Sequence, residues 1–129
     1  MRMSLVLMWI LLAVPTRSAP GADLTAEQVR GILASVAPDT PADLSGKSLE
    51  NLDLSKVDFK RANLSGANLF GAKLDSADFT GANLAGADLS GADLRDADLT
   101  GADATDADFG RAVMGGARGL ETVKGLSPR

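Results

Sequence analysis

The hydrophobic positions of this chain recur every five residues over more than half of its length. The series has fifteen consecutive positions, occupied by Leu44, Leu49, Leu54, Phe59, Leu64, Leu69, Leu74, Phe79, Leu84, Leu89, Leu94, Leu99, Ala104, Phe109 and Met114. A period of five fits neither the 3.6-residue repeat of an α-helix nor the two-residue alternation of a β-strand. Self-similarity at one fixed spacing is typical of a solenoid, so the pattern predicts a stack of repeated coils.

Each of these positions is the centre of a five-residue unit that is best written Ala-Asp/Asn-Leu-x-Gly. Clear copies begin at Ala62 and Ala87, and alanine recurs two places before the central residue without a break from Ala62 to Ala112. If one unit forms one side of a square coil, the central Leu and the small Ala fill a narrow interior. Gly or Ser at the corner then permits a backbone turn that a bulky residue would resist.

The residues that carry this repeat, over about positions 42–119, resemble the pentapeptide-repeat family. The resemblance implies an all-β solenoid, specifically a right-handed quadrilateral β-helix of pentapeptide repeats in which four units make one coil. Coils that stack through backbone hydrogen bonds lie ~4.8 Å apart, so nearly four coils make a rod only ~18 Å long. Fold alone does not assign a function, because members of the family diverge widely in role.

The repeat changes at both ends of the rod. Lys47, Leu52 and Val57 stand where later units carry Ala, which predicts a wider first coil, and Ala104 and Met114 replace Leu at the other end. After residue 119 the pattern stops, and residues 120–129 are predicted to form a lid at Leu120 followed by a mobile tail.

Residues 1–22 have the features of a secretory signal peptide. Arg2 precedes an apolar stretch at residues 3–14, and Pro15 and a small-residue segment through Ala22 follow it. The stretch is shorter than the ~20 apolar residues that a transmembrane helix needs, so we expect no stable membrane anchor. An apolar helix that folds onto the rod is the alternative, but it leaves the preceding Arg and the following small residues unexplained. The expectation is an exported protein, periplasmic or secreted.

One helix is predicted between the signal and the rod, within the capping and linker segment at residues 23–41. Thr25 is the candidate N-cap of a helix at residues 26–36, and Gln28 completes a capping box. The apolar residues Val29, Ile32, Leu33 and Val36 fall on one face at spacings of three and four. Because solenoids need their ends covered, this face is expected to cap the first coil, with a partner-binding helix as the alternative.

Composition argues against catalysis. The chain has no cysteine, histidine or tyrosine, so the usual general bases, nucleophile partners and zinc ligands are missing. We therefore expect no enzyme, no catalytic residues, no cofactor and no metal site. No stretch is basic enough to suggest binding of nucleic acid through its phosphates.

Acidic side chains offer the main functional lead. Between residues 75 and 108 there are nine carboxylates against one basic residue, Arg95, whereas residues 42–61 are balanced. With twenty residues per coil, Asp58, Asp78 and Asp98 would form one acidic column, in which stacked like charges should raise the carboxyl pKa values. The candidate interaction surface comprises this column together with Asp88, Asp93, Asp103 and Asp108.

Two functions fit these features. The first is an exported, non-catalytic scaffold that docks an unknown protein partner or has a structural role. The second follows from the resemblance, since some members of the family are thought to protect DNA gyrase by presenting a DNA-like acidic rod, and it would require a cytoplasmic protein. Part of a calcium loop is echoed by residues 106–110, but the bidentate Glu is absent, so no specific site is expected.

Overall fold

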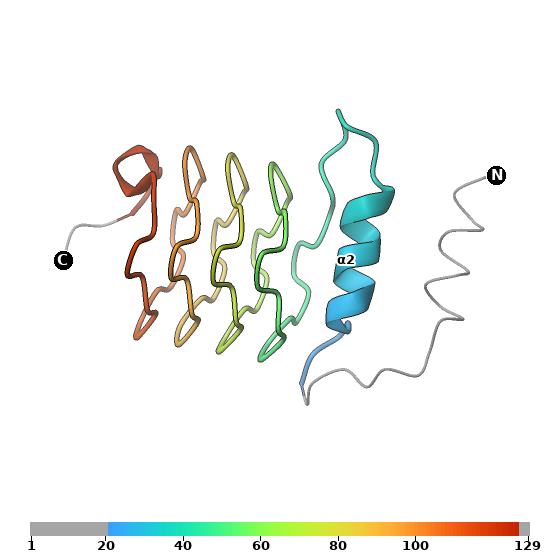
Figure 1. The fold of residues 1–129 in the computed structure, drawn as a ribbon, viewed down its shortest axis with the longest axis horizontal. Coiled ribbons are helices and arrows are strands. Elements are labelled where there is room, and N and C mark those ends of the chain that lie inside the picture. The colour runs from blue at the N-terminus through green and yellow to red at the C-terminus, as the bar shows by residue number, and fades with distance from the viewer. Residues whose placement is uncertain (1–20, 127–129) are drawn as a thin grey trace.

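Coils stacked one on the next form the body of the molecule (Figure 1). The computed structural model describes residues 21–126; most of the predicted signal peptide, at residues 1–20, lies outside them. The two helical elements are α2 at Ala26–Ser35 and the 3-10 helix η1 at Leu120–Thr122. Helix α2 lies across the N-terminal end of the stack and η1 lies at the C-terminal end (Figure 1). No helix within residues 21–126 has the length and apolarity needed to cross a bilayer.

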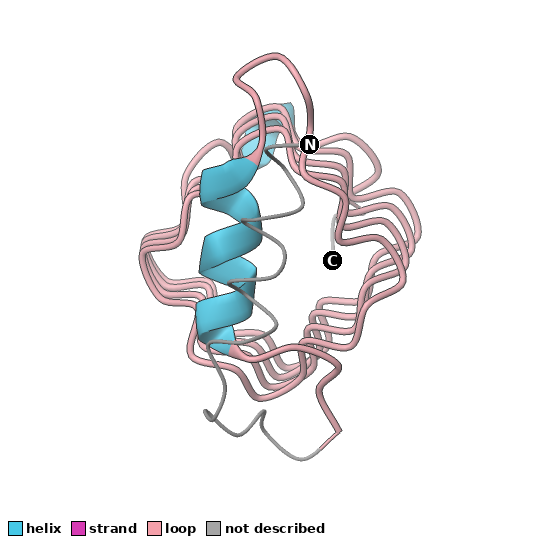
Figure 2. Cartoon of the chain, turned by 90° about the vertical axis from the view of Figure 1, so that its right-hand side faces the viewer, coloured by secondary structure: helices cyan, strands magenta, loops and turns pink. Residues whose placement is uncertain are grey.

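The coils pair in one parallel register. All of the bridges except the last, between Asp103 and Lys124, join residues twenty apart, as in Asp43 with Asn63 and Asn63 with Asn83. The Leu64 amide donates to the Asn83 carbonyl at 2.7 Å, and the Asn83 amide donates to the Ala62 carbonyl at 2.9 Å. Four pentads therefore complete one turn of the solenoid, and the end-on view shows the coils superimposed (Figure 2).

The all-β prediction needs one correction. Within residues 21–126 the coils pair through isolated bridges, and no run of residues is long enough to be a strand. The five-residue unit is too short for a strand. Each unit has one bridging residue, and a two-residue turn follows shortly after it. The Ala67 amide, for example, donates to the Leu64 carbonyl at 3.0 Å to close such a turn.

Every turn places one residue in the left-handed region of the backbone. Gly66 has a φ of 66°, and glycine adopts this conformation without steric cost. Several corners use other residues: Lys56, Arg61 and Ser76 have φ values of 62°, 57° and 59°. A side chain in this conformation costs roughly 1–2 kcal/mol, so these corners store strain that the stacked coils hold in place.

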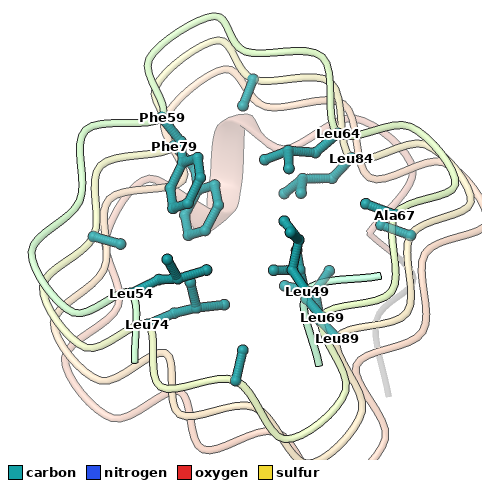
Figure 3. Packing of buried hydrophobic residues seen from close by; sticks show 14 of the residues in the cluster. Leu49, Leu54, Phe59, Leu64, Ala67, Leu69, Leu74, Phe79, Leu84 and Leu89 are labelled. Carbon is teal, nitrogen blue, oxygen red and sulfur yellow. The ribbon is translucent and has the colours of Figure 1, made fainter. Parts of the chain in front are cut away.

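The interior is filled by the central residues and the small residues two places before them. Leu64, Leu84 and Phe79 are fully buried, and Ala67 is 1% exposed. Figure 3 shows these side chains pointing inward from successive coils in matching rows. The prediction that these residues point inward is confirmed. Toward the C-terminus, Phe109 and Met114 are only partly buried.

Helix α2 forms where the sequence predicts it and ends one residue earlier. The Thr25 hydroxyl accepts from the Gln28 amide at 3.1 Å, and the Gln28 side chain accepts from the Thr25 amide at 2.8 Å, which confirms the capping box. Val29 is fully buried in the core, and Ile32, Leu33 and Val36 pack against it.

The two ends of the rod differ from the middle. Turn bonds of the first coil, such as the Leu52 amide to the Leu49 carbonyl at 3.4 Å, are longer than the 2.9–3.1 Å of later coils. These are the turns in which Lys47, Leu52 and Val57 stand in place of Ala, and the wider first coil stays a prediction. At the other end the coil continues past Leu120, where a mobile tail was expected. Lys124 pairs with Asp103, a step of twenty-one residues, and its amide donates to the Ala102 carbonyl at 2.9 Å.

Candidate interaction surface

The seven candidate carboxylates lie on all four sides of the rod. Bridges join Asp58 to Asp78 and Asp78 to Asp98, so the predicted column exists. Asp88 and Asp108 pair with each other on the opposite side. Asp93 and Asp103 lie on the two remaining sides, where they pair with Lys73 and Asn83. The structure therefore brings three of the candidates together in one column and separates the other four from it.

Each of these carboxylates has the same local role. One carboxylate oxygen accepts the backbone N–H two residues ahead, as at Asp78, where the Thr80 amide nitrogen lies 2.9 Å away. The Thr80 hydroxyl donates to the same oxygen at 2.6 Å. The other six carboxylates likewise accept a backbone N–H, from residues 60, 90, 95, 100, 105 and 110. This is an Asx turn, in which a short polar side chain satisfies the backbone at the start of a turn.

Asparagine caps turns in the same way elsewhere in the rod. Asn63 accepts from the Ser65 amide at 3.1 Å, and Asn83 accepts from the Ala85 amide at 3.0 Å. The requirement for Asp or Asn at this place in the unit is thus explained by turn formation, and negative charge is not needed for it. Sequence reasoning missed this role. The signal was readable, because Ser or Thr repeatedly follows Asp or Asn by two residues, as in Asp98 and Thr100.

Basic side chains interrupt the acidic column. The Lys60 ammonium lies 3.6 Å from an Asp58 carboxylate oxygen and 3.8 Å from one of Asp78. The Arg118 guanidinium lies 3.8 Å from an oxygen of Asp98. On the other sides Arg95 pairs with Asp93 at 2.6 Å, and Lys124 lies 3.9 Å from Asp103. Because basic side chains lie beside carboxylates on three of the four sides, the surface is less uniformly negative than the count of carboxylates predicts.

Hydrogen bonds, rather than like-charge repulsion, control the titration of the column at Asp98. The Thr100 hydroxyl, and then the Thr100 amide, lower the pKa of Asp98 from its ordinary value, with a further contribution from Arg118. The same two bonds from Thr105 lower the pKa of Asp103, and the Arg95 side chain lowers that of Asp93. The expectation that stacking raises the carboxyl pKa is therefore wrong at Asp98, because each carboxylate accepts donors from its own turn.

No metal site emerges in the part of the chain that the structure describes. Among residues 21–126, no three or more His, Cys, Asp or Glu side chains converge to hold an ion. At the partial calcium motif, an Asp108 carboxylate oxygen accepts the Gly110 amide at 2.8 Å, so this side chain also caps a turn.

Comparisons with known proteins agree with the geometry of the coils. The family model described as pentapeptide repeats matches eight copies over residues 42–75 and 77–116. HetL, a pentapeptide repeat protein involved in heterocyst differentiation regulation from the cyanobacterium Nostoc sp. strain PCC 7120, is 38% identical over 58% of this chain, with a TM-score of 0.56. This chain spans only 35% of the length of HetL.

Two further solved structures are similar at lower TM-scores. Rfr23 from the cyanobacterium Cyanothece 51142 is 32% identical, with 70% of this chain and 67% of Rfr23 covered and a TM-score of 0.48. A pentapeptide repeat protein from the Arabidopsis thaliana thylakoid lumen is 35% identical, with 67% and 71% covered and a TM-score of 0.45. None of the curated proteins compared with this chain matches it.

The neighbours imply that the four-sided coil is the right-handed quadrilateral β-helix of these proteins. With fifteen units in one register and a family model that covers more than half of its residues, the chain belongs to the pentapeptide repeat family.

Proposed function

We propose that this protein is an exported, non-catalytic scaffold that presents the outer faces of a short rigid rod to a protein partner. One observation carries the proposal. The inward side chains of the middle coils, such as Leu69, Leu89 and Phe79, are fully buried and leave the outer faces as the part of the rod free to bind. HetL, which shares the repeat, is involved in the regulation of differentiation, a role that suits a binding scaffold.

The face that carries Asp58, Asp78 and Asp98 is the proposed docking surface for a protein partner. Its carboxylates are held in position by their turns, so little side-chain entropy is lost when a basic partner binds. A protein partner suits this face better than a DNA-binding enzyme does, because Lys60 and Arg118 break the run of negative charge. The gyrase-directed alternative remains the second hypothesis from the sequence, and no contact in the rod favours it.

Exchange of the column for asparagine tests the docking surface. Asp58, Asp78 and Asp98 would be replaced together by Asn, which keeps the turn caps, as Asn63 and Asn83 do, while the charge is removed. A photo-crosslinking residue at Thr100, beside the column, should give a specific adduct in the native host that the triple variant loses. The same residue at Ser90, on the opposite side, is the control. Equal adducts from both positions, unaffected by the triple variant, would refute the docking surface.

A reporter fusion tests the location. Residues 1–25 joined to a reporter that is active only outside the cytoplasm should give activity, because Arg2 and the apolar stretch have the order that an export machinery reads. Replacement of Leu11 by Asp in the apolar stretch should abolish that activity. An inactive fusion, together with inhibition of gyrase supercoiling by the purified protein, would favour the second hypothesis.

A further inference from the structure

A cleft opens where the connection from α2 meets the first coil. Its volume is about 400 Å³, within the lower part of the range of small ligand sites. One wall is apolar and comes from the end of α2 and the following segment, with Leu33, Val36, Pro38 and Pro41. The other wall is a corner of the first coil, with Asp58, Lys60 and Arg61. In the end-on view, the segment after α2 extends beyond the outline of the coils (Figure 2).

The repeat itself provides a reference for this corner. In the second and third coils the positions that correspond to Lys60 are Thr80 and Thr100, and those that correspond to Arg61 are Gly81 and Gly101. Two basic residues therefore replace Thr-Gly only where the cleft lies.

Arg61 has an unfavourable backbone conformation at this corner. Its φ is 57°, in the region where the later coils place glycine. A non-glycine residue held there is disfavoured, so the stability of the coil alone would select glycine. The side chain instead reaches across the cleft, where its guanidinium donates to the Pro38 carbonyl. Lys56 and Arg111 occupy left-handed corners as well, with φ values of 62° and 61°, so the contact of its guanidinium with the Pro38 carbonyl is what sets Arg61 apart.

The two cations differ in how far they are neutralised. Lys60 lies within 4 Å of both Asp58 and Asp78, so its charge is compensated in place. Within residues 21–126, Arg61 has no carboxylate at ion-pair distance, and the bond to Pro38 uses one of its five N–H donors. The cleft therefore joins an apolar wall to one uncompensated, fork-shaped donor.

We infer that this cleft binds the carboxyl-terminal residue of a partner polypeptide. The terminal carboxylate of the partner accepts hydrogen bonds from two parallel N–H groups of the Arg61 guanidinium, the geometry in which Arg binds carboxylates best. An apolar terminal side chain packs on Leu33, Val36 and Pro38, and the rest of the partner chain leaves through the open side of the cleft. The inference rests on the proposed function as a protein-binding scaffold and assigns it a second contact, apart from the acidic column.

Binding of short peptides to the full-length protein tests this site. A fluorescein-labelled pentapeptide of glycine and serine that ends in leucine with a free carboxylate is the probe, and anisotropy reports its binding. The same peptide amidated at its C-terminus should bind about tenfold more weakly, because the charge-assisted pair is lost. A peptide that ends in serine should also bind more weakly, because it leaves the apolar wall uncovered. In ¹⁵N spectra, the shifts should change at Val36, Thr40 and Arg61.

Variants taken from the repeat provide the controls. Arg61→Gly restores the residue of the later coils, so it should fold with unchanged or higher melting temperature and bind the leucine peptide about tenfold more weakly. Arg61→Lys keeps the charge but loses the fork, and should fall between the two. Lys56→Ser copies Ser76 at a different corner of the rod and should bind normally.

Three results would overturn the inference. They are equal binding of the amidated and free peptides, tighter binding of hexanoate than of the leucine peptide, and no binding of the leucine peptide up to about 1 mM. If the peptide fails while the Thr100 crosslink still depends on the acidic column, the cleft inference fails and the proposed function stands. If both fail, the scaffold role fails with it.

Discussion

The rings of Phe59 and Phe79 stack directly on each other across two neighbouring coils, with centroids 5.0 Å apart and planes inclined by 4°. Both side chains are fully buried, and Leu99 occupies the same place in the next coil. Figure 3 shows the two rings parallel at one corner of the interior. The alignment follows from the parallel register, which places the same part of the unit one coil above the other.

Truncation of this stack should be costly. Phe79→Ala removes a buried ring from a tube whose backbone hydrogen bonds hold it open, so we expect a loss of about 3–5 kcal/mol of unfolding free energy. Phe79→Leu inserts the residue that already fills the column at Leu99, and should cost about 1.5 kcal/mol or less. Urea denaturation of both variants measures the difference. Similar losses for both would mean that this corner of the interior collapses around a cavity.

The turn cap at Asp78 gives a second prediction. Asp78→Ala removes the acceptor of the Thr80 amide and hydroxyl, and should lower the unfolding free energy by about 1 kcal/mol. Asp78→Asn keeps an oxygen acceptor, as at Asn83, and should change stability much less. Thermal melting at neutral pH and two salt concentrations measures both. A clear gain in stability for the Asn variant at low salt would restore the view that charge repulsion dominates the column.

The inward half of each unit was predictable because geometry leaves it little choice. A tube closed by five-residue sides has room for one large and one small side chain per side, so Leu84 and Ala82 are specified by spacing alone. The outward half follows from chemistry that is local to each turn. The spacing of Asp78 and Thr80 indicates the turn cap, whereas the acidity of Asp78 predicted only a charged surface.

Other features depend on contacts between distant segments. The pairing of Lys124 with Asp103 needs one extra residue in the last coil, and a search at a fixed period of five cannot detect such a shift. The cleft beside Arg61 exists only because the segment after α2 packs near this corner. The sequence shows that Lys60 and Arg61 depart from the repeat, and only the structure shows what they face.

The lowered carboxyl pKa values predict that the rod loses stability in acid. Because hydrogen bonds from Thr100 hold the pKa of Asp98 below its ordinary value of 3.8, the ionised form is favoured more in the folded state than in the unfolded state. The resulting stability is present above that value and is lost as the pH falls through the folded pKa. Asp103, Asp93, Asp53 and Asp43 act in the same direction.

Melting temperatures measured from neutral pH down to about pH 2 test this linkage. The melting temperature should begin to fall as the pH approaches the ordinary range of carboxyl pKa values. The fall should be shallower in a variant with Asp98→Asn and Asp103→Asn, because the amides do not titrate. Stability that rises as the pH falls would show that repulsion among carboxylates outweighs their hydrogen bonds.

Gly119, in the last coil, lies tightly against the neighbouring coil. A Cβ on Gly119 would lie 2.6 Å from the Cα of Thr100, and Gly119 also has a φ of 75°. Gly66 has a similar φ of 66° but no atom within 4 Å of the same position. Gly66→Ala should therefore cost only the conformational term of roughly 1–2 kcal/mol, whereas Gly119→Ala should cost more and loosen the coil that includes η1. Hydrogen exchange at the Lys124 amide measures this loosening, and equal protection in both variants would contradict it.

Helix α2 supplies the final prediction, because it lies across the N-terminal end of the stack. Val29 is fully buried in the core, so Val29→Asp would place an unpaired carboxylate against the Leu side chains of that coil, at a cost on the order of several kcal/mol. Ala34→Asp makes the same chemical change at an exposed position of the same helix and serves as the control. We expect the Val29 variant to lose exchange protection first in the coil that contains Leu44 and Leu49. Since each coil contacts only its neighbours, the loss should spread from this end toward η1 rather than begin there. Equal melting of the two variants would show that the rod is stable without the helix and would favour the alternative in which α2 binds a partner.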